Sequence, residues 1–301
     1  MTMCCPVFGF SSVRFLRGLF SRFPGRMLWV VCLGMGWGVP ACAQDAGELP
    51  ANRFTTHATL FGAGRSSLYE TYLSPVTYTG PHVAFLHETL RKTHWLEGRI
   101  STQSVVDGFF SYASNRSGNS NEMAGKLNYA IGWHYNWLLG GLRLMAGGEV
   151  HAGLGAIYNT RNSNNPVQAK AELDLGASLM AIYPFYIRKV PFTVRYQATV
   201  PLVGGMFSPR YGQSYYEMSL GNYDRNVCFT HPANAPSMRH FLTLDFPIAG
   251  FTFRAGYLCD IRQSRVNGLR SHIWNHSFMI GYVKHFGFVK RKESQHRPFI
   301  L

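Results

Sequence analysis

The chain has 301 residues, a formal net charge of +14 and only 15% charged residues. Soluble domains average about 25% charged residues, so this composition argues against an ordinary water-facing exterior. The basic residues are scattered, without a basic helix or an aromatic-basic motif, and we therefore expect no nucleic-acid partner. Anionic phospholipid and lipopolysaccharide headgroups fit such a charge excess better.

Residues 1–43 have the pattern of a cleaved signal peptide. Four arginines precede the apolar run 27–39, and Ala41 and Ala43 supply small residues for cleavage before Gln44. Thirteen apolar residues are too few for a membrane-spanning helix, which needs roughly 20. Lipoprotein processing at Cys42 and a start at Met27 are the alternatives.

Removal of this leader changes the charge and the cysteine count. It takes four of the 29 basic residues and none of the 15 acidic ones, which leaves a net charge of +10. Four of the six cysteines leave with it, so that Cys228 and Cys259 remain. Two cysteines make neither a disulfide framework nor a metal-binding spacing, and whether they pair stays open. We expect residues 44–54 to form a short periplasmic segment.

The first part of the mature chain predicts three strands. Residues 55–64 alternate, with Ala58 and Leu60 opposed to His57 and Thr59. Residues 65–80 are rich in Ser, Pro and Tyr and are predicted to form a loop. Residues 81–91 give the weakest strand, residues 95–112 give the third, and residues 113–122 form a polar loop.

The strongest pattern lies between residues 123 and 161. Odd positions from Met123 to Trp137 are apolar or aromatic, apart from Gly125, and the even ones are mostly polar or small. After residues 138–141 the alternation resumes in the other phase. Because successive side chains of a strand point to opposite faces, this is a long hairpin with one apolar face.

The same period of two continues through the second half. Residues 167–185 and 190–202 form a second hairpin, residues 204–238 are irregular, and residues 239–246 and 251–262 form a third hairpin. A loop at 263–271 precedes a last strand at 272–288, and residues 289–301 form a basic tail.

These segments predict an all-β, antiparallel transmembrane β-barrel of ten strands over residues 55–288. Connections are expected to be short after even strands and long after odd ones, as in outer-membrane barrels whose termini are periplasmic. Short amphipathic stretches such as residues 215–220 could add two strands, so twelve is the alternative.

The apolar face is predicted to point outward. The strands exceed the roughly ten residues that cross a membrane, mixed charges lie on the opposite face, and a closed barrel satisfies all backbone groups in lipid. Aromatic residues at strand ends resemble membrane-interface girdles; they are Trp133, Tyr135, Trp137, Tyr158, Tyr183, Phe185, Phe286 and Phe288. A soluble lipocalin-type barrel is the alternative.

Two sets of candidate residues follow from this facing. The lumen set holds charges of both signs that could pair across a narrow interior: Lys126, Arg143, Glu149, His151, Lys170, Glu172, Asp174, Arg195 and Arg254. The loop set lies in the longest irregular segment, where an extracellular ligand could bind: Tyr215, Tyr216, Tyr223, Asp224 and Arg225.

No catalytic residue, metal ligand or cofactor is assigned. Glu172 and Asp174 lie two apart on one face, as paired carboxylates would for acid-base catalysis, but a salt-bridged filling is the preferred interpretation. No histidine has a serine two residues later, the spacing expected of an outer-membrane lipid hydrolase. Asp224 with His231 is a weak protease candidate.

The leader, the alternation, the aromatic-rich last strand and the stretch Tyr72, Leu73, Ser74 and Pro75 resemble a family of outer-membrane barrels from Bacteroides-type bacteria, a domain of unknown function. The resemblance covers most of residues 55–288. It implies the fold and the location and supplies no catalytic residue. The tail after the terminal aromatics departs from the usual barrel-assembly signal.

The sequence therefore predicts a non-enzymatic barrel in the bacterial outer membrane, either a narrow pore or an anchor with ligand-binding loops. Its partners would be membrane lipid, lipopolysaccharide and the barrel-assembly machinery. The alternative is an outer-membrane hydrolase acting on lipid or protein. Side chains can fill a barrel of this size, so low conductance or none is expected. Lysine at Ile131 or Leu175 should destabilise the barrel, and lysine at Asn128 or Ser178 should be mild.

Overall fold

The computed structural model describes residues 53–223 and 225–288. The predicted signal peptide, the segment up to residue 52 and the basic tail lie outside these residues. Within them, the chain is almost entirely β-structure, and no helix there is long and apolar enough to cross a membrane. The elements are β1 (Arg53–Glu70), β2 (Ser74–Lys92), η1 (Trp95–Gly98), β3 (Ile100–Asn115), β4 (Asn121–Leu139), β5 (Leu142–Asn159), β6 (Val167–Ile187), β7 (Val190–Phe207), α3 (Tyr215–Ser219), β8 (Val227–Thr230), β9 (Met238–Ile248), β10 (Phe251–Val266) and β11 (Leu269–Phe288).

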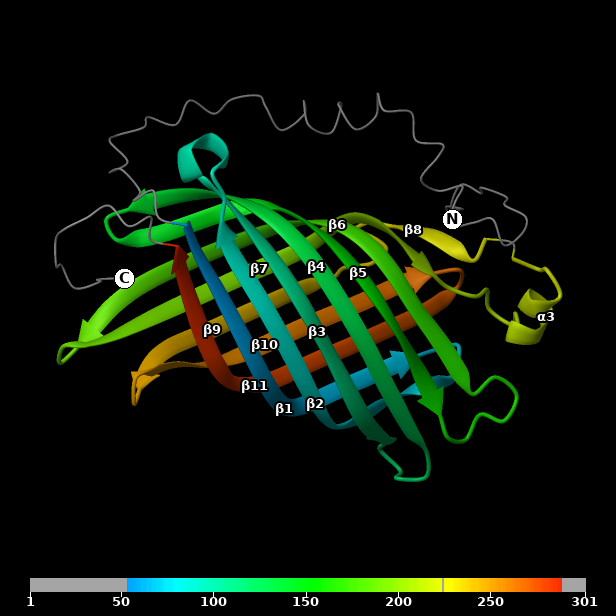
Figure 1. The fold of residues 1–301 in the computed structure, drawn as a ribbon. Coiled ribbons are helices and arrows are strands. Elements are labelled where there is room, and N and C mark those ends of the chain that lie inside the picture. Colours follow the sequence, from blue (N-terminus) through cyan, green and yellow to red (C-terminus); the bar gives the residue numbers. More distant parts are fainter. Residues whose placement is uncertain (1–52, 224, 289–301) are drawn as a thin grey trace.

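Ten of the described strands close into an antiparallel barrel (Figure 1). The strands pair in chain order from β1 to β7, then through β9 and β10 to β11, which pairs with β1 along its whole length. Strand β8 pairs with the last four residues of β7 and is no part of the ring. This confirms the predicted ten-stranded barrel, and the twelve-stranded alternative is wrong because residues 215–219 form helix α3.

The two ends of the barrel differ. At the terminus end, where β1 begins and β11 ends side by side (Figure 1), the turns at 140–141, 188–189 and 249–250 have two residues each. The connection 93–99 there is longer and contains η1, so β3 begins at Ile100 and not at residue 95 as predicted. At the loop end lies the longest connection, residues 208–237, with α3 and β8.

Two predicted loops are strands. Residues 65–80 were expected to be irregular, but β1 and β2 continue to a turn at 71–73, because Leu68 and Tyr78 are both buried inside the barrel. Residues 263–271 form a tight hairpin around Asn267 and Gly268, both with positive φ. The expected long connections after the first and ninth strands are therefore wrong.

The facing of the side chains confirms the main prediction. Outward positions carry large apolar groups, such as Leu127 (60% exposed) and Leu154 (67%), and inward positions carry buried polar groups such as Lys126 and His151. This arrangement, apolar outside and polar inside, is that of a transmembrane barrel.

Strand β1 is an exception to this facing. Its apolar Ala58 and Leu60 point inward and are fully buried, and His57 and Thr59 point outward. The outward pair forms hydrogen bonds with β2, where Thr59 Oγ1 is 2.9 Å from His87 Nδ1. The cause is an apolar cluster inside the barrel, made of Ala58, Leu60, Leu86, Phe241, Leu258, Met279 and Val283.

Candidate functional site

The interior of the barrel contains all the acidic residues of the described strands. The side chains of a strand alternate between its two faces. Each of these acidic residues falls on the inward face of its strand. Seven of the nine are at least 91% buried, and Glu149 and Glu172 are half-buried. The nine are Glu70, Glu88, Asp107, Glu122, Glu149, Glu172, Asp174, Asp245 and Asp260. Every strand of the ring except β7 and β11 therefore contributes an acidic residue to the lumen.

Toward the terminus end, Glu88 is the centre of a network that joins five strands. Arg195 and Arg254 both donate to its carboxylate. Arg195 Nη1 lies 2.7 Å from Glu88 Oε2, and Arg254 Nη1 lies 2.9 Å from the same oxygen. Arg254 also holds Asp245 with two bonds of 2.6 and 2.8 Å. Gln103 donates to Glu88 at 2.6 Å and exchanges amide bonds with Gln197.

Nearer the loop end, Arg262 on β10 is the centre of a second network. Its Nη1 lies 3.2 Å from Glu172 Oε1 and 3.5 Å from Asp174 Oδ2, and its Nε lies 3.3 Å from Asp260. Lys126 donates to the same oxygen of Glu172. Beside this network Arg239 pairs with Asp107 at 2.7 Å.

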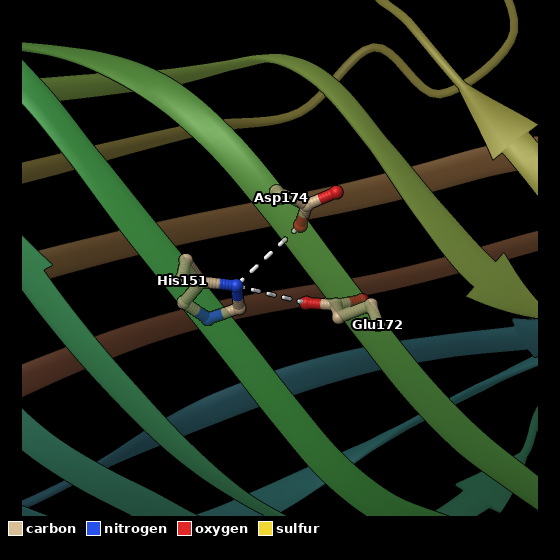
Figure 2. Close-up of side chains that lie close together, drawn as sticks. All are labelled: His151, Glu172 and Asp174. Atoms are coloured by element: carbon tan, nitrogen blue, oxygen red, sulfur yellow. Dashed lines mark ion pairs between the residues drawn. The ribbon is translucent and has the colours of Figure 1, made fainter. Parts of the chain in front are cut away.

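His151 on β5 faces Glu172 and Asp174 on β6 (Figure 2). Its Nδ1 is 3.4 Å from Asp174 and 3.7 Å from Glu172, and its Nε2 is 3.3 Å from Arg262 Nη2. One imidazole nitrogen and two carboxylates within 4.8 Å of one another form a possible donor set for a metal ion. Lys126 and Arg262 already neutralise both carboxylates, however, so the arrangement fits an ion-pair network better than a cation site.

The layer of the interior that lies closest to the loop end combines an ion pair with apolar packing. Lys170 pairs with Glu70 and donates to Ser271 at 2.8 Å. Asn159 bridges Glu122 and the Tyr78 hydroxyl, each at 3.0 Å. Around them lies an apolar cluster of Leu68, Leu73, Tyr78, Ala113, Ala124, Ile157 and Ile273.

Of the predicted lumen residues, Lys126, His151, Glu172 and Asp174 are brought together in one network. Arg195 and Arg254 meet through Glu88, and Lys170 meets Glu70; neither acidic partner was among the candidates. Glu149 lines a small cavity with Arg239. Arg143 has the inward parity of His151 and lies at the terminus end of β5, where it is exposed at the mouth of the barrel. The missed Arg262 lies on the polar face of its predicted strand. The missed Glu70 and Glu88 lie in the stretches that were predicted as a loop and as the weakest strand.

A second group missed by the sequence prediction is a chain of buried hydroxyl, imidazole and amide groups. His82 lies between Ser66 and Ser277, with Nδ1 3.0 Å from Ser66 Oγ and Nε2 2.6 Å from Ser277 Oγ. Ser66 donates to Asn275 at 2.6 Å. All four side chains are at least 95% buried. Sequence spacing could not reveal it, because three different strands supply it.

The loop candidates have different roles. Tyr216 (71% exposed) and Tyr223 (55%) face solvent, and Asp224 lies outside the described residues. Arg225 has a positive φ of 59°. The exposed surface of this loop also includes residues that the sequence prediction missed: Tyr211 (78%), Leu220 (71%), Val227 (63%) and Phe229 (51%).

Tyr215 is a structural residue that fixes the loop to the barrel. Its hydroxyl donates to Gln168 Oε1 at 3.1 Å and accepts from the Ala169 amide at 2.8 Å. Its ring meets Tyr72 edge-on, and the Tyr72 hydroxyl donates to the Gln213 carbonyl at 2.9 Å. Burial raises the pKa of Tyr72 to about 12 and also raises the pKa of Tyr215, so both hydroxyls stay protonated at neutral pH.

A model of the family described as "Protein of unknown function (DUF3316)" matches residues 27–293. No curated protein matches the chain. Solved structures with a similar fold include three outer-membrane barrels. The translocator domain of autotransporter NalP from Neisseria meningitidis has 11% identity, a TM-score of 0.36, and coverage of 91% of this chain and 100% of that one.

The other two are comparable. The beta domain of the Bordetella autotransporter Brka has 12% identity, a TM-score of 0.40, and coverage of 76% of this chain and 98% of that one. The COG4313 outer membrane channel from Pseudomonas putida F1 has 12% identity, a TM-score of 0.33, and coverage of 83% and 100%. Similarities at this level do not extend to function.

Proposed function

Because this chain belongs to the DUF3316 family of proteins of unknown function, we propose its function from its own geometry: a non-enzymatic barrel of the bacterial outer membrane that anchors a binding loop. The observation that carries the proposal is the filled lumen. Two ion-pair networks and two apolar clusters occupy the interior. Two cavities beside them measure about 50 and 30 Å³, which is room for a few water molecules.

The binding element in this proposal is the connection 208–237. At the loop end it crosses the barrel mouth, with bonds to the β1–β2 turn, to β6 and to the β10–β11 turn. Its exposed Tyr211, Tyr216 and Tyr223 offer large, rigid contact area with a polar tip, as aromatic residues at binding surfaces do. The loop end faces the cell exterior, where lipopolysaccharide surrounds the barrel. The chain enters the membrane through the barrel-assembly machinery.

Planar-bilayer recording of the purified protein tests the sealed lumen. We expect conductance at the level of the bare membrane over the whole voltage range, because the two networks and the two apolar clusters fill the described part of the lumen. Steps of porin size would refute the anchor and favour a pore.

The hydrolase alternative has one observation in its favour, the Ser66, His82 and Ser277 chain. A nucleophile and a base within hydrogen-bond distance, with the base held by a third group, is the arrangement of a catalytic triad. All these side chains are buried, however, and they line neither of the cavities described above. A fluorophosphonate probe should therefore leave Ser66 and Ser277 unlabelled in the folded protein. Labelling of Ser277 that is lost in His82→Ala would establish a hydrolase.

A further inference from the structure

The barrel wall is interrupted on the β9 side of β7. Residues 193–199 of β7 pair with β9, and residues 204–207 pair with β8. Residues 200–203 have no backbone partner on that side among the described residues. Unpaired backbone at membrane depth is tolerated only where it is covered by protein or lines a polar cavity. Pro201 reduces the cost, because proline has no N–H to leave unpaired.

A cavity of about 50 Å³ lies at this interruption and is lined by residues of the outer surface and of the interior. Its lining includes Leu202, which is 49% exposed on the outside, and Lys126 and Glu172, which belong to the interior network. The opposite rim is formed by Ala235 and by Ser237, whose hydroxyl is bonded to β10. The cavity has room for about four water molecules.

The outer surface of the barrel beside the cavity is apolar. Leu175 lies opposite Val203 in the β6–β7 register, and Leu173 lies opposite Gly205. The side chains of Leu173 and Leu175 are about half exposed on the outside, as is that of Phe229 on β8. An acyl chain in the membrane would therefore meet apolar side chains on both sides of the opening.

The inner end carries charges of both signs. Lys126, Lys170 and Arg262 line it, against Glu172 and Asp174. The ammonium group of Lys126 has three donors, and its side chain is only 5% exposed. Within the described residues it has a hydrogen bond to Glu172 alone. Two N–H groups are thus available to an acceptor that enters the cavity.

We propose that this opening is a lateral binding site for an amphiphile with an anionic headgroup. The carboxylate or phosphate occupies the cavity and accepts hydrogen bonds from Lys126, with Arg262 beside it. The apolar chain stays in the membrane along Leu175, Leu202 and Phe229. The site opens toward lipid and ends blind in the filled lumen, so it binds from the membrane and not from the aqueous phase.

Photo-crosslinking in phosphatidylcholine vesicles tests this site. One arm contains a diazirine-bearing fatty acid, a second contains a diazirine-bearing phosphatidylglycerol, and a third contains a diazirine-bearing phosphatidylcholine. We expect labelled peptides from residues 200–206 and 227–237 in the first arm, in the second, or in both, at about tenfold the level on Leu127 of β4 and Leu154 of β5, which face lipid away from the cavity. The arm that labels identifies the carboxylate or the phosphate as the headgroup.

Two alanines of the same loop provide the matched variants. Ala235→Trp fills the cavity and should reduce the labelling at least about tenfold. Ala233→Trp changes an exposed alanine that does not line the cavity and should leave it unchanged. Lys126→Gln should also weaken labelling about tenfold, through the lost charged donor.

Three results would overturn the proposal. The first is labelling at residues 200–206 that equals the labelling of Leu127 and Leu154 in both anionic arms. The second is equal labelling by the phosphatidylcholine probe, which would remove the preference for an anionic headgroup. The third is undiminished labelling in Ala235→Trp, which remains informative even if Lys126→Gln fails to fold.

Discussion

Glu88 shows how a single residue can hold the interior of this barrel together. It is 98% buried and accepts hydrogen bonds from Arg195, Arg254 and Gln103. Replacing it by glutamine leaves two buried guanidinium groups to share Asp245 as a counter-ion. Loss of one member of a buried ion pair typically costs about 3 to 5 kcal/mol, and we expect Glu88→Gln to lower the free energy of unfolding by that amount.

Denaturant unfolding of the barrel in lipid vesicles measures this change. Glu97→Gln is the control, because Glu97 is exposed in η1 and surface substitutions usually stay within about 0.5 kcal/mol. Equal stability of the two variants would mean that the network around Glu88 contributes packing and no net electrostatic stabilisation.

At the scale of the element, the sequence predicted strands wherever one face was clearly apolar. The hairpin of β4 and β5 and the hairpin of β6 and β7 lie close to their predicted positions. The strand structure of residues 65–80 was missed because their outward side chains are mostly polar. These residues lie at the loop end of the barrel, where the strands still pair but no longer face lipid. The tight turn at Asn267 and Gly268 was missed although Asn-Gly is a strong hairpin signal, because the polar residues around it suggested a loop.

The lipid-facing surface of β6 gives a prediction that depends on depth. Leu175→Lys places a charge in the middle of the strand, where lysine costs about 2 to 4 kcal/mol of unfolding free energy. Val167→Lys and Ile187→Lys place the same charge at the two ends of β6, where about 0 to 1 kcal/mol is expected. Vesicle unfolding of the three variants checks this order, and equal costs would contradict the membrane position of the barrel.

Interior positions cannot serve as mild controls here, contrary to what the sequence predicted. Ser178 is fully buried and accepts a hydrogen bond from Gln197, and Asn128 is 98% buried and donates to Asp107. Alternation distinguishes inside from outside, but it gives no information on how tightly the inside is packed.

The loop 208–237 is fixed to the barrel by individual hydrogen bonds. Tyr72→Phe removes the bond to the Gln213 carbonyl, which contributes about 1 kcal/mol, so local opening should rise about fivefold. Limited proteolysis within the loop measures the opening. Tyr211→Phe is the control, because that ring is 78% exposed.

The pH dependence of this bond follows from the pKa of Tyr72, which burial raises to about 12, above its ordinary value of 10. A phenol whose folded-state pKa is raised stabilises the docked loop fully below pH 10 and loses that contribution as the pH rises through 12. The difference between Tyr72→Phe and the unaltered protein should therefore persist up to pH 10. A difference that disappears at neutral pH would contradict this role.

At the scale of the whole molecule, the sequence predicted a mixed-charge lumen but not its organisation. Lys126 and Glu172 are 46 residues apart in the chain, and Arg195 and Glu88 are 107 residues apart. Such pairs depend on the closure of the ring and on the register between strands, which alternation within one strand does not specify. The apolar cluster around Leu60 and Phe241 was missed for the same reason: residues from five strands meet there.

Because these layers lie below the loop, the loop should not be what closes the barrel. We expect a variant with residues 209–225 replaced by a short Gly-Ser linker to conduct no more than the bare membrane in planar-bilayer recording. The same replacement at residues 116–120, a turn of the loop end that lacks α3, is the matched control. Discrete current steps in the first variant alone would show that the loop gates an open lumen. Baseline current in both would place the barrier in the side chains around Arg262 and Glu88.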